Sequence, residues 1–486
     1  MTESIAETVL NAAQRSGAEY ADIRVMDMLK ESIVVKNERV ESAHRSTSIG
    51  FGVRVLLDGA WGFSSSRNLS VGEAERVTRA AVEIARASRM AQREKICLAP
   101  AEAAQEVWNT PLVKDPFAVP LEEKLSLLDA AVSGLRSVPG ITIAEGSMNF
   151  WRRNQVFANT EGSRIEQTIV HSGAGMSATS VKNGEIQVRS YPNSFRGQYQ
   201  AGGYEVVEAM ELPKHAERVA SEATALHSAR QCPAGKTTLI LDGSQLALQI
   251  HESCGHPAEL DRALGSEINF AGTSFLTHDK LGTLRYGSDI VNIVADATYR
   301  TSPRGLGTFA FDDEGVPAQC VHIVRDGIFV GYLSSRETAS AIGLQSTGAM
   351  RASSWSRIPL VRMTNVSLLP GESSLDEMIA GTDDGIFMST NRSWSIDDKR
   401  LNFQFGTEIG WLIKNGKLTE MVKNPTYSGV TPTFWGGCDA IAGPDEYEIW
   451  GTPNCGKGQP QQIMHTGHGA SPARFRNVSV GVAYDR

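Results

Sequence analysis

The segment FGVRVLLDGAWGF, residues 51–63, gives the clearest indication of fold in this chain. From Phe51 to Val55, apolar residues alternate with polar or small ones, which is the pattern of a strand with one buried face. The dipeptide Asp58-Gly59 follows, and both residue types tolerate the positive φ angles of a tight hairpin turn. The alternation resumes at Trp61, so the segment predicts an antiparallel β-hairpin.

Amphipathic helices and further strands are expected on both sides of this hairpin. Apolar residues at helical spacing predict helices near residues 5–12, 70–84, 121–135 and 205–230. Alternating or continuous apolar runs predict strands near residues 21–25, 32–40, 141–188 and 237–241. Ser70 and Glu73 form a capping box, which marks the start of the second helix. Because helices and antiparallel strands occur in mixed order in both halves, the sequence predicts an α+β fold with mostly antiparallel sheets.

The length of the chain, 486 residues, predicts more than one domain, because single hydrophobic cores stop growing beyond about 250–300 residues. The run from Gln231 to Gly235 contains proline and glycine, and it separates a predicted helix from an apolar strand. We therefore expect an N-terminal α+β domain over residues 1–231 and a β-rich C-terminal domain over residues 232–486.

The composition disfavours several classes of partner. The formal charge is −8, with 55 acidic against 47 basic residues, which gives no electrostatic attraction to nucleic acid or anionic lipid. Glu3 and Glu7 lie where a signal peptide would be basic and then apolar, and no later run reaches bilayer length. Six scattered cysteines without a Cys-x-x-Cys pair fit a reducing compartment. We expect a cytoplasmic protein without a disulfide framework, and neither nucleic acid nor membrane as a partner.

The run HESCGH, residues 251–256, carries the strongest indication of chemistry. It begins like the H-E-x-x-H pattern of zinc proteases, but it holds one more residue between the histidines. On an ideal helix, residues five apart are separated by about 140° of rotation, so both imidazoles cannot bind one ion. A π turn, which joins residues i and i+5, would return them to one side, and Gly255 makes such a distortion less costly. Pro257 also biases His256 away from regular helix. The spacing predicts a metal site only if the helix is distorted.

Catalytic zinc sites usually have three protein ligands and a water, so a third ligand must come from elsewhere in the chain. The residues themselves leave the choice open among Cys455, Cys254, Glu259, Asp261, His465 and His468. Cys254 lies on the apolar face of the predicted helix, which favours a place in the core. His465 and His468, in a glycine-rich stretch, are candidates for lining a substrate site. The acidic run Asp312-Asp313-Glu314 precedes Gly315, which indicates a hairpin turn more than a metal cluster.

Several blocks, found in order along the chain, resemble the TldD/PmbA family, and specifically the TldD branch, which keeps the metal motif that PmbA-type (TldE) subunits lack. The blocks are HExxGHxxExD at residues 251–261, DDEGxP at 312–317, RMTN at 362–365, LPG at 369–371 and CGKxQ at 455–459. A weaker similarity in the N-terminal half includes GVR at residues 52–54. Together they cover most of the chain.

The resemblance implies a zinc metallopeptidase in which Zn²⁺ is bound by His251, His256 and Cys455 in the C-terminal domain, with Glu252 as the general base. It also implies a dimer that encloses the active site, formed with a PmbA/TldE-type subunit or with a second copy, and substrates that are unfolded or short peptides. The chemistry is consistent, because zinc lowers the pKa of bound water to about 7 and a glutamate can accept the released proton.

Two other functions remain open from the sequence. A zinc amidase without peptidase activity would use the same ligands. A non-catalytic subunit of a TldD/PmbA-type complex is the second alternative, although such a chain is expected to lack the motif at residues 251–256. A nucleobase deaminase is disfavoured, because its Pro-Cys-x-x-Cys signature is missing from the sequence.

Overall fold

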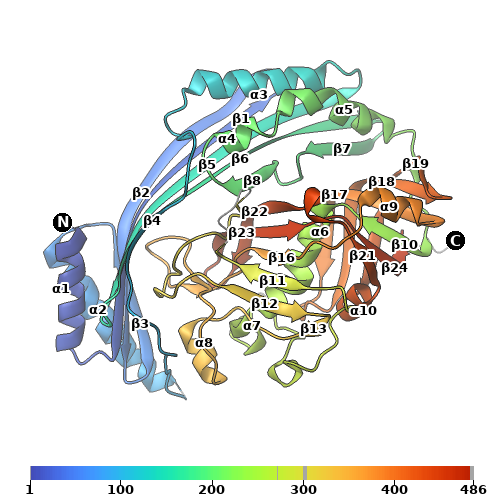
Figure 1. The fold of residues 1–486 in the computed structure, drawn as a ribbon. Coiled ribbons are helices and arrows are strands. Elements are labelled where there is room, and N and C mark those ends of the chain that lie inside the picture. The colour runs from blue at the N-terminus through green and yellow to red at the C-terminus, as the bar shows by residue number, and fades with distance from the viewer. Residues whose placement is uncertain (1, 93, 271, 299–303, 482–486) are drawn as a thin grey trace.

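The computed structural model describes residues 2–92, 94–270, 272–298 and 304–481. The N-terminal half is built on one long, curved sheet that arches over the C-terminal half (Figure 1). Its strand order is β3-β2-β1-β5-β6-β4, and β7 and β8 also pair with β6. The strands are β1 (Tyr20–Lys36), β2 (Arg39–Leu57), β3 (Ala60–Ser66), β4 (Gln105–Asn109), β5 (Ile141–Asn159), β6 (Arg164–Lys182), β7 (Glu185–Tyr191) and β8 (Gln198–Ala201).

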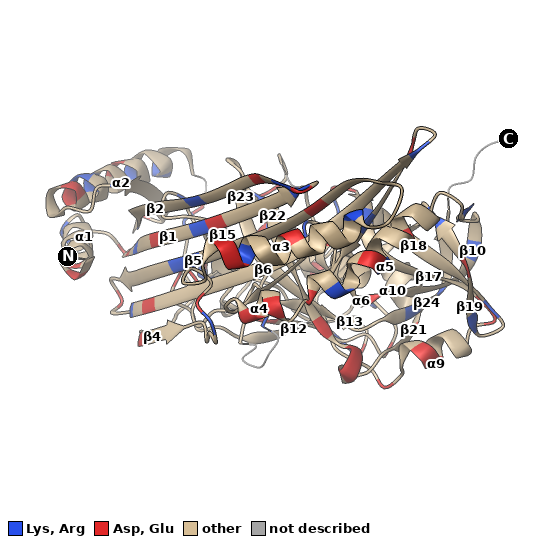
Figure 2. Cartoon of the chain, turned by 90° about the horizontal axis from the view of Figure 1, so that it is seen from above, with Lys and Arg blue, Asp and Glu red and all other residues tan. Residues whose placement is uncertain are grey.

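Helices cover the convex face of this sheet. They are α1 (Thr2–Arg15), α2 (Val71–Ala91), α3 (Leu121–Arg136), α4 (Glu205–Glu208) and α5 (Leu212–Ala225). Figure 2 shows β2, β1, β5, β6 and β4 beside one another, with α3, α4 and α5 above them. Odd-numbered residues of β1, such as Ile23 and Ile33, are buried against the helices. Because side chains alternate along a strand, even-numbered residues such as Asp22 and Arg24 face the C-terminal half instead.

The predicted hairpin is confirmed, while two predicted elements are wrong in their extent. Asp58 and Gly59 have φ angles of 49° and 73° and join β2 to β3, as their turn chemistry predicts. The expected helix over residues 205–230 is broken into α4 and α5, because Glu211 has φ 47° and leaves helical geometry. The two strands expected at residues 21–25 and 32–40 are one strand, β1, which continues to Lys36 and so leaves Val40 to β2.

The C-terminal half contains an eight-stranded sheet, a four-stranded sheet and two strand pairs. The eight-stranded sheet comprises β9 (Arg230–Gln231), β10 (Gly235–Leu241), β17 (Asp384–Ile396), β18 (Asn402–Lys414), β19 (Lys417–Lys423), β20 (Thr426–Val430), β21 (Cys438–Ile441) and β24 (Ala473–Val480). The four-stranded sheet comprises β11 (Ile293–Asp296), β12 (Cys320–Arg325), β13 (Ile328–Phe329) and β16 (Val366–Leu368). The pairs are β14 (Met350–Arg351) with β15 (Leu360–Val361), and β22 (Glu448–Lys457) with β23 (Gln462–Ala470).

Short helices connect these sheets. They are α6 (Gly243–Ile250), α7 (Leu260–Ala263), α8 (Arg336–Ala341), α9 (Leu375–Ala380) and α10 (Thr431–Gly436). The predicted α+β class with mostly antiparallel sheets is therefore confirmed. All six cysteines are free thiols. Within the described residues, no helix is both long and apolar enough to cross a bilayer.

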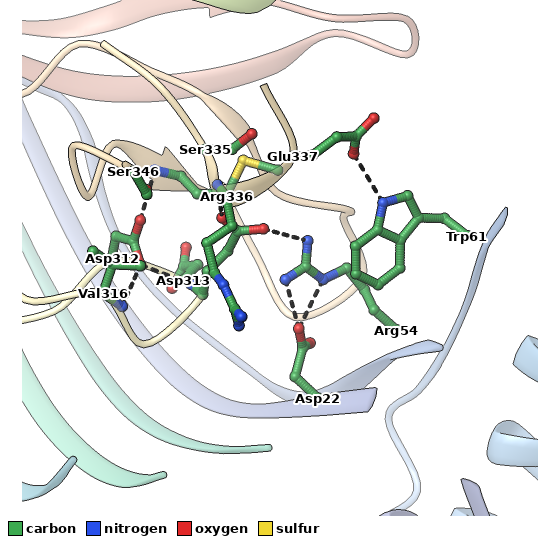
Figure 3. A network of polar contacts seen from close by, with 12 residues as sticks. Asp22, Arg54, Trp61, Asp312, Asp313, Val316, Ser335, Arg336, Glu337 and Ser346 are labelled. Atoms are coloured by element: carbon green, nitrogen blue, oxygen red, sulfur yellow. Dashed lines mark hydrogen bonds and ion pairs between the residues drawn. The ribbon is translucent and has the colours of Figure 1, made fainter. Parts of the chain in front are cut away.

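Buried ion pairs join the two halves beneath the arch. The Arg54 guanidinium on β2 donates to Asp22 Oδ2 at 2.5 Å and lies 3.3 Å from Glu314 Oε1 of the C-terminal half. All three side chains are at most 1% exposed. Figure 3 shows Arg54 between Asp22 and the loop that begins at Asp312. Because a buried charge is stable only when it is paired, this contact fixes how the sheet sits on the C-terminal half.

The acidic run 312–314 forms a turn, as its sequence predicts, with Gly315 at φ 79°. Its carboxylates have separate partners and do not converge on one point. Asp312 Oδ1 accepts hydrogen bonds from the backbone N–H groups of Glu314 and Val316, each at 2.9 Å. Asp313 faces Arg24, and Glu314 faces Arg54. These acidic groups hold the two halves together and do not form a metal cluster (Figure 3).

We predict that Arg54→Leu destabilises the protein strongly. It removes the guanidinium that pairs with both Asp22 and Glu314, and breaking a buried pair in this way typically costs about 3–5 kcal/mol. Urea unfolding followed by circular dichroism measures the loss. Arg76→Leu is the matched control, because its partner Glu73 lies beside it on exposed helix α2 and this pair should contribute little. Equal unfolding free energies for the two variants would contradict the assignment.

Candidate metal centre

The π turn that chelation by both histidines would require is present at the end of helix α6. This helix follows strand β10 directly, and every residue from Gly243 to Ile250 is buried. From His251 to Gly255 the chain forms a π-helix, and the His256 N–H donates to the His251 carbonyl, five residues earlier. The wider turn places the two imidazole rings on one side, with centroids 4.8 Å apart and planes at 88°.

Gly255 is required by close packing against the turn. A Cβ atom at position 255 would lie 2.1 Å from Met363 Sδ, which is far inside van der Waals contact. The φ angle of Gly255 is −67°, an ordinary helical value, so the turn itself does not demand glycine. The sequence suggested that glycine eases the helix distortion, whereas the structure shows that it makes room for the RMTN segment.

Three potential ligand atoms meet beside this turn. His251, His256 and Cys455 each offer one atom, and these atoms all lie within 4.8 Å of one another. Cys455 lies on strand β22, and its Sγ is 3.5 Å from His256 Nε2. The three residues are only 3–4% exposed. A buried set of two imidazoles and one thiol has the donor types and number of a catalytic zinc site with an open position.

Hydrogen bonds to buried neighbours fix the tautomer of His251. His468 Nδ1 donates to the Val366 carbonyl at 3.1 Å, so a neutral His468 presents Nε2 as an acceptor. That Nε2 lies 2.7 Å from His251 Nδ1, which must therefore be the donor. Burial lowers the pKa of His251 to about 4, so the ring is neutral at physiological pH. His251 Nε2 is left with a free lone pair, as a metal ligand requires.

A second buried contact orients His256 in the same way. Its Nδ1 donates to Glu259 Oε2 at 3.0 Å, which leaves Nε2 unprotonated beside Cys455. Burial opposes ionisation of Glu259, but Lys457 at 3.3 Å and His256 hold the pKa of this carboxyl well below its usual value. A charged carboxylate behind a histidine is a common support for a metal-bound imidazole.

The thiol of Cys455 is predisposed to ionise. Burial by itself would raise its pKa, but His256 and Arg362 lie close enough to lower it below the usual value. The guanidinium of Arg362 also donates to the Cys455 carbonyl at 2.6 Å, which anchors strand β22 at this residue. Because the thiolate is the form of cysteine that binds metals, this environment fits a ligand role.

The other candidate ligands do not join the cluster. Cys254 Sγ accepts a hydrogen bond from Tyr286 Oη at 2.8 Å within the core, and burial raises its pKa to about 12. Asp261 is paired with Lys457 at 2.7 Å. His465 points to the other half of the molecule, where its Nδ1 lies 2.9 Å from His171 Nδ1. Glu259 and His468 contact the candidate histidine ligands from behind, as described above.

Glu252 lies between the two histidines in sequence and forms an ion pair with Arg400. Its side chain is 8% exposed, so the carboxylate is held inside the protein by a cation. Arg400 could not be predicted from the sequence, because it lies in the loop after β17 without a motif around it. The residue types around Arg400 also give no indication of its left-handed backbone conformation, with φ 63°.

A fold of this class, with a buried His/His/Cys cluster and an adjacent glutamate, is that of a metallopeptidase family. Family models described as PmbA/TldA metallopeptidase domain 1, central domain and C-terminal domain match residues 21–85, 114–229 and 234–481. The chain therefore belongs to the PmbA/TldD metallopeptidase family, as its motifs predicted. The prediction of a metalloprotease is confirmed at the level of this family.

Individual relatives and solved structures agree with this assignment. A metalloprotease of Methanocaldococcus jannaschii is 31% identical over 413 residues, which is 85% of this chain and 87% of the relative. A zinc metalloprotease TldD homologue of Saccharolobus solfataricus is 23% identical over 87% of this chain and 88% of its own length. The crystal structure of TldE from Thermococcus kodakarensis has a TM-score of 0.72 at 14% identity and covers 98% of this chain and 99% of its own. A candidate modulator of DNA gyrase from Thermotoga maritima has a TM-score of 0.78 at 18% identity, with 99% and 100% covered.

We predict that His468→Phe weakens divalent-metal binding by about 10–100-fold, the usual effect of removing a group that orients a ligand. Phenylalanine cannot accept the hydrogen bond that His251 Nδ1–H donates to His468. His468→Gln should retain more affinity, because its amide oxygen can accept the same hydrogen bond. Competition with a chelating indicator measures the affinity, and His278→Phe, remote on an exposed turn, is the control. An unchanged affinity in His468→Phe would show that His468 does not orient the site.

Proposed function

We propose that this chain is a zinc-dependent peptidase that hydrolyses unfolded or short peptides. In this proposal His251, His256 and Cys455 hold Zn²⁺ in the C-terminal domain, and Glu252 is the general base. The observation that carries it is the convergence of three buried donors within 4.8 Å, with both imidazoles presenting an unprotonated Nε2. Zinc in such a set supplies Lewis acidity, which makes water nucleophilic at neutral pH and polarises a carbonyl.

The protein's own groups account for proton handling and orientation. Glu252 Oε2 is occupied by the Arg400 guanidinium, which leaves Oε1 to accept a proton from the attacking water. The same oxygen then returns the proton to the leaving amine of the cleaved peptide bond. Arg400 is a positioning residue in this scheme, because it fixes the rotation of the carboxylate and touches no reacting atom.

The buried setting of the site supports the choice of substrate. Donors that are 3–4% exposed can be reached by an extended chain but not by the surface of a folded protein. A peptide that binds as an added strand is recognised mainly through its main chain, which permits many sequences. Unfolded and short peptides satisfy both conditions.

We further propose that the working form is a cytoplasmic dimer, made with a PmbA/TldE-type subunit or with a second copy. The fold similarity to a TldE structure supports a partner of related shape. The net charge of −8 supports the expectation that neither nucleic acid nor membrane is a partner.

Two alternatives make different predictions. A zinc amidase that is not a peptidase would bind zinc and leave peptides intact. A non-catalytic subunit would show no turnover that depends on Glu252. The intact glutamate and its ion pair with Arg400 favour a catalytic chain over the second alternative.

The decisive experiment compares the purified chain with Glu252→Gln. We expect about one zinc per protomer in both. We also expect hydrolysis of an unfolded reporter peptide to fall by about 100-fold or more in the variant, because a general base typically contributes 10²–10⁴-fold.

Glu337→Gln is the matched control, since this glutamate accepts a hydrogen bond from Trp61, is not one of the proposed ligands or the base, and a glutamine oxygen can still accept the bond. Equal turnover by wild type and Glu252→Gln would remove Glu252 from the mechanism. Zinc binding without peptide hydrolysis in the wild type, alone and with a PmbA-type partner, would favour the amidase.

A further inference from the structure

A cavity of about 600 Å³ lies between the concave face of the N-terminal sheet and the C-terminal half. Strands β1, β2, β5 and β6 form one wall, while residues 351–357 and strands β22 and β23 form the other. This volume is within the range of small-ligand pockets, about 300–1,000 Å³. The cavity also adjoins the candidate metal centre, because its wall includes Met464, which pairs with Cys455 across the β22–β23 hairpin.

The charges that line this cavity are all positive. Lys30, Arg152, Arg153, Arg351 and Arg357 line it, and its described wall contains neither aspartate nor glutamate. This excess occurs in a chain whose net charge is −8. A cavity with low-dielectric walls and one sign of charge concentrates ligands of the opposite sign.

Only part of this positive charge is balanced by nearby carboxylates. Arg152 lies 3.5 Å from Asp115. Arg153 is near Asp313, and the same carboxylate also forms an ion pair with Arg24. Among the described residues, Lys30, Arg351 and Arg357 line the cavity without an ion-pair partner within 4 Å.

Two buried groups of the wall also lack a polar partner within the described structure. His171 Nε2 and Arg351 Nε make no hydrogen bond, although their residues are 6% and 4% exposed. Burial and the neighbouring guanidinium groups of Arg153 and Arg362 lower the pKa of Arg351 to about 9, which still leaves it charged at neutral pH. Arg351 Nε is a donor, and buried donors normally have partners, so this wall is suited to an anionic, hydrogen-bond-accepting ligand.

The edge of β2 indicates that this ligand is an extended chain. Ser46, Thr47 and Ser48 border the cavity and belong to the part of β2 that lies beyond its pairing with β3. Within the described residues, no other strand covers that edge. An exposed strand edge offers main-chain donors and acceptors to an added peptide strand, which a small inorganic anion would not use.

We propose that this cavity is a substrate subsite that binds the carboxylate of a peptide, either its C-terminus or an acidic side chain, through Lys30, Arg351 and Arg357. This inference rests on the proposed peptidase function. It narrows the substrates of the enzyme to peptides that carry an anionic group near the peptide bond that is cleaved. The neighbouring Trp151 ring, 5.8 Å from Lys30 Nζ and 4.6 Å from the His465 ring, supplies an apolar surface beside the charge. His465, expected from the sequence as a substrate-site candidate, is part of this wall.

The test measures binding rather than turnover, in the full-length Glu252→Gln background. Three fluorescent peptides share one neutral, N-acetylated sequence. The first has a free C-terminal carboxylate, the second a C-terminal amide, and the third an amide with one internal glutamate. The cavity variant is Lys30→Ala with Arg357→Ala. The control, Arg79→Ala with Lys417→Ala, removes the same charge from exposed positions on α2 and β19.

We expect at least one carboxylate-bearing peptide to bind about tenfold more tightly than the neutral amide, and added salt to reduce this preference. The cavity variant should lose the preference, while the control keeps it. Preference for the first peptide assigns a C-terminal carboxylate, and preference for the third assigns an acidic side chain.

Equal binding of all three peptides would overturn the proposal. So would a cavity variant that keeps the preference for carboxylate-bearing peptides while it unfolds at the same temperature as the control variant. Displacement of the peptide by an oligonucleotide at lower concentration than by unlabelled acidic peptide would also overturn it. Because binding is measured without turnover, failure here leaves the role of Glu252 untouched. Conversely, unchanged hydrolysis by Glu252→Gln would refute the proposed mechanism without affecting this result.

Discussion

The π turn at residues 251–255 is the constraint on which the candidate site depends. In a regular α-helix, two residues five apart differ by about 140° of rotation, and His256 would point away from His251. The wider turn removes this difference and sets the two rings 4.8 Å apart. A turn of this kind is rare in proteins, and it survives here because it is buried and packed against Met363 on one side.

Buried neighbours then give the two imidazoles a defined chemical form. A chain of hydrogen bonds runs from the Val366 carbonyl through His468 to His251, and a charged contact runs from Lys457 through Glu259 to His256. Each ends on a ring whose Nε2 is free to coordinate. The supporting residues come from distant segments, so the site exists only when the C-terminal half is fully folded. The Asp22–Arg54–Glu314 contact ties that half to the curved sheet, whose concave face completes the neighbouring cavity.

Local patterns in the sequence predicted the individual helices, strands and turns better than they predicted how these elements are arranged in space. The hairpin at Asp58-Gly59 follows from residue chemistry within a few positions and is present, and the π turn that the histidine spacing would need for chelation is present too. The break at Glu211 was missed, because a left-handed glutamate leaves no trace in apolar spacing. Arg400 was missed too, since it meets Glu252 from 148 residues away and belongs to no motif. The basic cavity combines residues from strands β1, β2, β5, β6, β22 and β23 with residues 351–357, which no single window of sequence contains. The division into domains at residues 231 and 232 stays a prediction.

The central claim is that one divalent cation is held by two imidazoles and the Cys455 thiolate. X-ray absorption spectroscopy at the zinc edge of the zinc-loaded protein tests it most directly. The account predicts one sulfur at about 2.3 Å and nitrogen or oxygen neighbours at about 2.0–2.2 Å. The sulfur should disappear in Cys455→Ser. A zinc environment without sulfur in the wild-type protein, or one with several sulfurs, would contradict the proposed site.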